Sequence, residues 1–262
     1  MARRVPEGPA PEPAVQKLRV RYARRGRLRF SSTRDFQRAL ERALRRAGVP
    51  MAYSAGFHPH PKISYAGAAP TGAASEAEYL ELSVIERLDV ARLRQALDAA
   101  LPQGLDVLEV VEAGADSLAD RLEASLWRLE FTGVAEADLA HAVETLLART
   151  EVLVTRMMKR GPRTFDVRGA VVALDASPAD RPGCAILQMV VRHTTPAVRP
   201  DDVLTALREV VGLAPASPPL ATRLAQGPLE SATARVADPL AADRDVDGAG
   251  PGDAPTREPD TA

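Results

Sequence analysis

One order of predicted secondary structure occurs twice along this chain, and it constrains the fold more than any other feature. In the first half, alternating apolar and polar residues predict strands at 18–22 (resuming at 28–30), 78–85 and 105–111, and helical periodicity predicts helices at 32–47 and 89–101. In the second half, strands are predicted at 126–131, 151–157, 164–168, 170–174 and 185–191, and helices at 136–147 and 200–211. With the short strand expected at 62–65, the first half follows the order strand, helix, strand, strand, helix, strand of a split βαβ, or ferredoxin-like, unit, and the second half is expected to repeat this order. We therefore expect an α+β protein in which two ferredoxin-like units, residues 15–112 and 113–227, pack together.

The two ends of the chain differ in composition from this middle part. Residues 1–14 are rich in Pro and Ala and have no periodicity, and residues 228–262 are rich in Asp, Gly, Pro and Ala. Such segments bury too little apolar surface to order a chain. We expect a disordered N-terminus and a disordered acidic tail.

The first predicted helix has clear signals at both ends and on both faces. Ser32 is a potential N-cap with Asp35 three residues later, and Gly48 is a natural stop. Apolar residues share one face, namely Phe36, Ala39, Leu40, Ala43, Leu44 and Ala47. The opposite face carries Arg34, Arg38 and Arg45, with Arg42 beside them. These arginines are expected to be exposed and not needed for folding.

Charge is unevenly distributed along the sequence. The net charge is −1, yet residues 17–62 sum to about +11 and residues 230–262 to about −5. A basic surface of this kind favours an anionic partner such as RNA. The alternative is that arginine simply solvates the surface.

A proline-stiffened loop follows the first helix. Pro59 and Pro61 fix two φ angles, so the segment 56–64 is expected to be extended and to present Phe57, His58, His60 and Lys62. The two histidines are candidates for polar or stacking contacts to a ligand, or for stabilising the loop. A metal site is not predicted, because it needs a third or fourth ligand.

The segment after the loop is expected to pair with the strand that contains Glu78. A hairpin between residues 62–65 and 78–81 sets Lys62 near Glu78 or Glu81. Two roles are open: an ordinary cross-strand ion pair, or phosphate binding by Lys62 with Phe57 and Tyr65 stacking on bases. Ser64 and Tyr65 belong to the same candidate site.

Two further basic positions are candidates for ligand or RNA binding. Lys159 and Arg160 precede a Gly-Pro turn, and would form one positive surface with the first helix if the two lie side by side. Arg199 stands directly before a predicted helix, where it can bind an anion or pair with Asp201 and Asp202.

The loop and the following strand also carry a resemblance. The pattern Ser54-x-Gly56-Phe57-x-Pro59-x-Pro61-Lys62-Ile63-Ser64-Tyr65, then Ser75-x-x-Glu78-Tyr79-Leu80-Glu81, resembles the radical SAM-linked protein family, and the likeness extends over about residues 15–227. Members of that family are stand-alone proteins or C-terminal domains of B12-binding radical SAM proteins, and their activity is unknown. The resemblance implies three possible partners: RNA, a radical SAM enzyme and a ribonuclease of the E/G type.

Several classes of function are not indicated by the sequence. It has no Cys-x-x-x-Cys-x-x-Cys cluster motif, no P-loop, no Gly-x-Gly-x-x-Gly and no Gly-x-Ser-x-Gly, so no cofactor and no catalytic residue is assigned. One cysteine, Cys184, and the lack of a long apolar stretch predict a cytoplasmic protein that does not enter a membrane. The leading hypothesis is an RNA-binding or substrate-presenting module. The alternatives are an enzyme acting at the Gly56–Ser64 loop, with His58, His60 and Glu78 as acid–base groups, and a scaffold that docks another protein.

Overall fold

The computed structural model describes residues 11–247. Its first part contains β1 (Gln16–Arg24), the 3₁₀ helix η1 (Gly26–Phe30), α1 (Thr33–Arg46), β2 (Ile63–Ala66), β3 (Ala74–Val84), α2 (Val90–Ala100) and β4 (Leu105–Glu112). Its second part contains α3 (Leu118–Arg121), β5 (Ala124–Thr132), α4 (Glu136–Leu147), β6 (Leu153–Met158), β7 (Gly161–Asp166), η2 (Arg168–Ala170), β8 (Val171–Pro178), β9 (Cys184–Arg192), α5 (Pro200–Val211) and β10 (Leu220–Gly227). The chain continues through β11 (Leu229–Glu230), β12 (Arg235–Val236) and α6 (Ala241–Asp247).

Eight strands form one mixed sheet with the order β4-β1-β3-β10-β5-β9-β8, and β2 pairs with β3 beside this path. Within each half the pairing is antiparallel, in the orders β4-β1-β3-β2 and β10-β5-β9-β8. The halves are joined by a short parallel contact between β3 and β10, where Thr222 is opposite Ala74 and Arg223 is opposite Ser75. The α+β class is confirmed.

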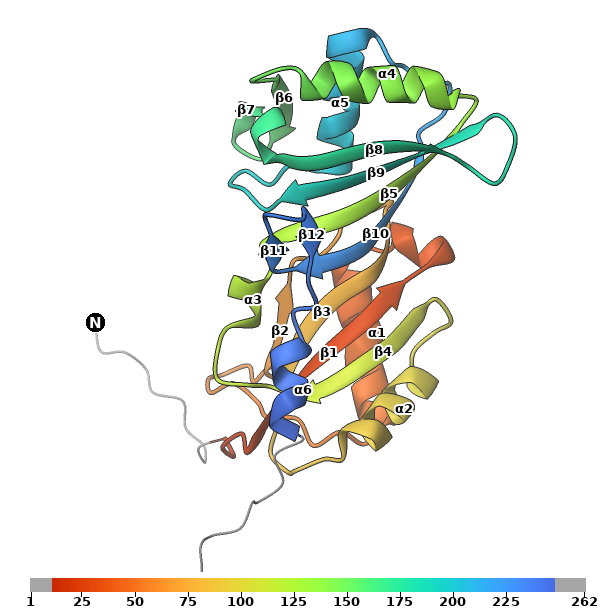
Figure 1. Ribbon diagram of the computed structural model, residues 1–262. Coiled ribbons are helices and arrows are strands. Elements are labelled where there is room, and N and C mark those ends of the chain that lie inside the picture. Colours follow the sequence, from red (N-terminus) through yellow and green to blue (C-terminus); the bar gives the residue numbers. More distant parts are fainter. Residues whose placement is uncertain (1–10, 248–262) are drawn as a thin grey trace, which may run out of the picture.

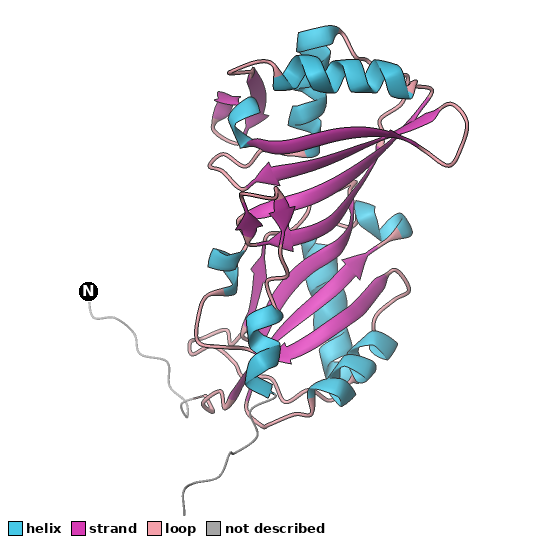
Figure 2. Cartoon of the chain, viewed as in Figure 1, coloured by secondary structure: helices cyan, strands magenta, loops and turns pink. Residues whose placement is uncertain are grey.

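Helices at the two ends of this sheet close separate cores. Figures 1 and 2 show α1 and α2 against one end of the twisted sheet and α4 and α5 at the other. Under α1 and α2 lie alternating strand residues such as Leu18, Val20, Leu80 and Leu82, because successive side chains of a strand point to opposite faces. Under α4 and α5 lie Leu129, Phe131, Leu187 and Met189. A cavity lined by residues of both halves, among them Pro70 and Trp127, lies between these two cores.

Two of the sequence-based predictions about the fold were wrong. The strand expected to resume at 28–30 is η1, since Gly26 has a φ of 55° and turns the chain before the Leu28 N–H bonds the Arg25 carbonyl. The tail expected to be disordered from 228 is ordered to 247: Leu240 is fully buried, and Asp243 is fully buried beside Arg19 and Arg121. The rest of that tail and residues 1–10 lie outside the described residues. Between 11 and 247, no helix is both long and apolar enough to span a bilayer.

Candidate functional site

The solvent face of α1 carries four exposed arginines, which we call the arginine stripe: Arg34, Arg38, Arg42 and Arg45. The helix is oriented by its apolar face, where Phe36, Leu40 and Leu44 are at most 6% exposed. Its ends match the sequence signals, because the Ser32 side chain accepts a hydrogen bond from the Asp35 N–H and Gly48 has a φ of 64°. Arg34 and Arg45 are about 16 Å apart along the helix axis at 1.5 Å per residue. No stripe arginine forms an ion pair with another described residue.

Other basic residues near the N-terminus are bound to the protein itself. Carboxylates hold Lys17, Arg19 and Arg25, and backbone carbonyls hold Arg21 and Arg24. Arg24 donates three hydrogen bonds, to the carbonyls of Ala69, Pro70 and Ala73. Besides the stripe, the basic residues of 17–62 whose side chains have no ion-pair or hydrogen-bond partner among the described residues are Arg27 and Arg29 on η1, and Lys62 in the proline loop.

The proline loop is a narrow hairpin that presents its side chains to solvent. Tyr53 bridges to Pro61, and Ser54 binds His60 twice: the Ser54 N–H donates to the His60 carbonyl (2.9 Å) and the His60 N–H donates to the Ser54 Oγ (3.1 Å). Phe57 is 63% exposed, and His58 and Lys62 are exposed too. Residues 11–247 contain no cluster of three or more His, Cys, Asp or Glu that could hold a metal.

The predicted hairpin between β2 and β3 is confirmed, but the cross-strand ion pair, one of the two roles left open for Lys62, is not formed among the described residues. Ser64 is exposed and lies opposite Glu81, whose carboxylate binds Lys17 at 2.7 Å and Arg19 at 3.0 Å instead of Lys62.

Tyr65 is half-buried rather than available for stacking on a base. Its ring packs edge-on against Phe36, with 6.0 Å between centroids. Burial, and the nearby Glu41 carboxylate, raise the pKa of Tyr65 to about 12. Its role is therefore in the core under α1.

Glu78 is buried where the two halves of the sheet meet. It is 2% exposed, and its Oε1 lies 2.5 Å from the Nη2 of Arg223, which is 3% exposed. The Arg223 Nη1 also donates to the Gly67 carbonyl at 2.6 Å, and the Gln226 amide donates to the Ala77 carbonyl at 2.7 Å. The side chains of Arg223 and Gln226 therefore provide hydrogen-bond donors for backbone carbonyls beside the short parallel contact between β3 and β10. Glu78 is buried and paired with Arg223, whereas His58 and His60 are exposed, so the acid–base grouping that the alternative enzyme hypothesis needs is not seen among the described residues.

The second basic segment lies far from the stripe. Lys159 and Arg160 are exposed at the turn between β6 and β7. Figure 1 shows this hairpin beside α4 and α5, at the opposite end of the sheet from α1. One continuous positive surface is therefore not formed.

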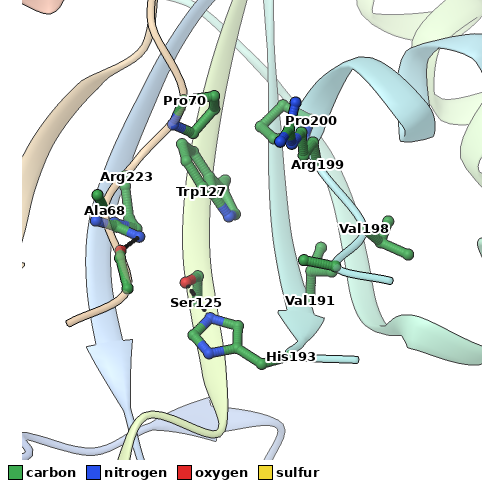
Figure 3. A pocket seen from close by; sticks show the side chains of 12 residues that line it. Ala68, Pro70, Ser125, Trp127, Val191, His193, Val198, Arg199, Pro200 and Arg223 are labelled. Carbon is green, nitrogen blue, oxygen red and sulfur yellow. Dashed lines mark hydrogen bonds between the residues drawn. The ribbon is translucent and has the colours of Figure 1, made fainter. Parts of the chain in front are cut away.

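Arg199 lies at the edge of a cavity between the two halves. The backbone N–H of Arg199 donates to the Asp202 Oδ2 at 2.7 Å. The Asp202 carboxylate forms its ion pair with Arg156 instead, and the Arg199 side chain has no ion-pair partner in the described part of the chain. The cavity encloses about 290 Å³. Figure 3 shows Trp127 at its centre, Ser125 and His193 at one end, Arg199 and Val198 on one side and Arg223 on the other.

Of these cavity residues, the sequence singled out only Arg199 as a binding residue. Ser125 comes from β5 and His193 from just beyond β9, and no sequence spacing relates them. The antiparallel pairing of β5 with β9, which places Ser125 opposite Val191, is what brings them together.

Comparison with known proteins gives one family and distant structural neighbours. Residues 17–200 match the family described as "Uncharacterized protein conserved in bacteria (DUF2344)". No curated protein matches the chain. Among solved structures, a heme-bound variant of DypB from Rhodococcus jostii RHA1 is 12% identical, with 82% of this chain and 92% of that chain covered and a TM-score of 0.22. A manganese-bound DypB variant is 13% identical, with the same coverage and a TM-score of 0.23. At these TM-scores the likeness carries no argument about fold or activity.

Proposed function

The chain belongs to the bacterial family described as uncharacterized conserved proteins (DUF2344), and we propose that it binds RNA through the arginine stripe of α1. The observation that carries this proposal is a row of four exposed arginines without ion-pair partners among the described residues. Positive side chains that protrude from one helix face neutralise successive phosphates of a nucleic-acid backbone. Lysine and arginine residues that already bind carboxylates, as Lys17 and Arg25 do, are less available for this role.

The loop that follows α1 provides a second type of contact. Phe57 and Tyr53 are 63% and 43% exposed, and an exposed aromatic ring offers a face on which an unpaired base can stack. Lys62 adds a further exposed positive charge in the same loop. A helix with basic side chains followed by an aromatic loop favours RNA with single-stranded parts, because bases within a duplex do not present their faces.

We also propose the finer features that the resemblance and the topology suggest. Each half of the chain, with its strand–helix–strand–strand–helix–strand order, is proposed to be a ferredoxin-like unit, the second with the β6–β7 hairpin inserted. The resemblance to radical SAM-linked proteins supports a role beside a radical SAM enzyme or a ribonuclease of the E/G type, in RNA modification or processing in the cytoplasm. The alternative enzyme at the Gly56–Ser64 loop has weaker support, because His58 and His60 are exposed and lie apart from buried Glu78.

The test is binding of the full-length protein to labelled tRNA and rRNA fragments at two salt concentrations, with a DNA duplex of equal length as control. Binding through several phosphates predicts a steep loss of affinity as salt increases. A preference for RNA with single-stranded parts over the duplex is expected. No binding to any of the RNAs at low salt would rule the proposal out.

A further inference from the structure

The cavity between the two halves is lined by a serine and a histidine that lie within hydrogen-bond distance of each other. Ser125 is 2% exposed and lines one end of the cavity (Figure 3). Its Oγ lies 2.8 Å from the Nε2 of His193 (Figure 3). The other ring nitrogen, Nδ1, lies 2.7 Å from the Leu122 carbonyl oxygen. Both ring nitrogens are thus engaged, one with a hydroxyl and one with a backbone acceptor.

These two contacts fix the tautomer of the neutral ring. A carbonyl oxygen can only accept a hydrogen bond, so Nδ1 carries the proton and donates to Leu122. The Nε2 lone pair is then free to accept the hydrogen bond that the Ser125 hydroxyl donates. A hydroxyl next to a base, with that base oriented by a third group, is the arrangement that activates a serine as a nucleophile.

The surroundings lower the pKa of this base, although the residue as a whole is exposed, and place positive charge around the cavity. Burial lowers the pKa of His193, and the nearby Arg223 lowers it further, whereas the hydrogen bond to Leu122 acts in the opposite direction. Arg199 and Arg223 both line the cavity, and the Arg199 side chain has no ion-pair partner between residues 11 and 247. The apolar part of the wall comes from Pro70, Val191 and Val198.

We propose that Ser125 and His193 form a nucleophile–base pair, and that the cavity accepts a small ester that carries a negative charge. The Ser125 Oγ bonds to the carbonyl carbon of the ester as its proton passes to the His193 Nε2. The ester C–O bond breaks, and the leaving oxygen takes that proton and departs as an alcohol. Water then attacks the acyl-serine, releases the carboxylic acid and restores the serine. Arg199 attracts the negative group of the substrate. The proposal depends on the cavity alone and not on RNA binding by α1.

Labelling of the folded full-length protein with an alkyl fluorophosphonate tests the nucleophile directly. An activated serine forms a Ser–O–P bond with this reagent as fluoride leaves, and the serine proton passes to the base. We expect one label per chain, located at Ser125 by peptide mass spectrometry, while Ser83 on β3 remains unlabelled. His193→Gln should slow labelling by about 100-fold or more, the size of a typical general-base contribution. The labelling rate should fall at acidic pH, where His193 becomes protonated.

A second measurement tests whether the cavity hydrolyses esters and whether Arg199 selects those with a negative charge. Hydrolysis of a neutral and of an anionic p-nitrophenyl ester is compared for Arg199→Gln and for Arg208→Gln, an exposed arginine farther along α5. Arg199→Gln should slow the anionic ester much more than the neutral one, and Arg208→Gln should change neither rate. Absence of a label on the folded wild-type protein, or a label on another residue, would overturn the proposal and leave RNA binding by α1 unaffected.

Discussion

Removing the charge of Glu78 should destabilise the protein far more than removing the charge of an exposed glutamate. In Glu78→Gln, the buried guanidinium of Arg223 loses the carboxylate that lies 2.5 Å away, while both positions are at most 3% exposed. Breaking a buried ion pair by changing one partner costs about 3 to 5 kcal/mol. We expect the lower part of this range, because Arg223 keeps its hydrogen bonds to the Gly67 carbonyl and to Gln226. The free energy of unfolding should therefore fall by about 3 kcal/mol.

Urea denaturation at neutral pH measures this change, with Glu76→Gln as the matched control. Glu76 pairs with Arg25 at the surface, where the two side chains are 28% and 45% exposed, so its loss should cost less than about 1 kcal/mol. A double variant, Glu78→Leu with Arg223→Met, removes both charges and should recover part of the stability. If Glu78→Gln costs no more than Glu76→Gln, the pair does not hold the two halves of the sheet together and this reasoning is refuted.

Three other changes probe the remaining structure. Asp243→Asn weakens the contact that holds α6 against the sheet, and should lower stability by about 3 kcal/mol because Arg19 is fully buried; urea denaturation checks this. Burial lowers the pKa of His193, so the unfolded chain binds a proton at this residue more readily than the folded chain does. Stability should therefore fall as pH drops below about 6.5. Denaturation at pH 7.5 and at pH 5 should show a smaller fall in His193→Gln than in the wild type. Gly67→Ala places a Cβ 2.4 Å from the Gln226 Oε1 at a φ of 58°, and should lower the melting temperature by several degrees in calorimetry.

The parts of the fold that sequence predicted are those determined by local signals. The N-cap at Ser32, the apolar face of α1 and the left-handed glycine at 48 each depend on residues within a few positions of one another. The hairpin between β2 and β3 also followed from alternation and short separation. The exposure of the arginine stripe was a consequence of the same periodicity.

The parts that sequence missed depend on partners far apart in the chain. An arginine in a strand pattern is normally assigned to the exposed face, yet Arg19 is buried because Asp243, 224 residues later, neutralises it. Arg223 is buried in the same way by Glu78, 145 residues away. Composition alone predicted a disordered tail, because composition does not show that an acidic residue such as Asp243 pairs with a buried arginine. The contact between Ser125 and His193 likewise appears only once β5 and β9 are paired.

The salt dependence of RNA binding in two triple variants tests the central claim most directly. One variant replaces Arg34, Arg38 and Arg45 on α1 with Gln, and the control replaces Arg149, Arg181 and Arg208, three exposed arginines of the second half, with Gln. Both lose the same charge, and both should keep the wild-type melting temperature, because exposed substitutions change stability by less than about 0.5 kcal/mol. The account predicts that only the α1 variant weakens RNA binding, and that its slope of log affinity against log salt is flatter by about 2 to 3 units. Equal slopes in the two variants would contradict it.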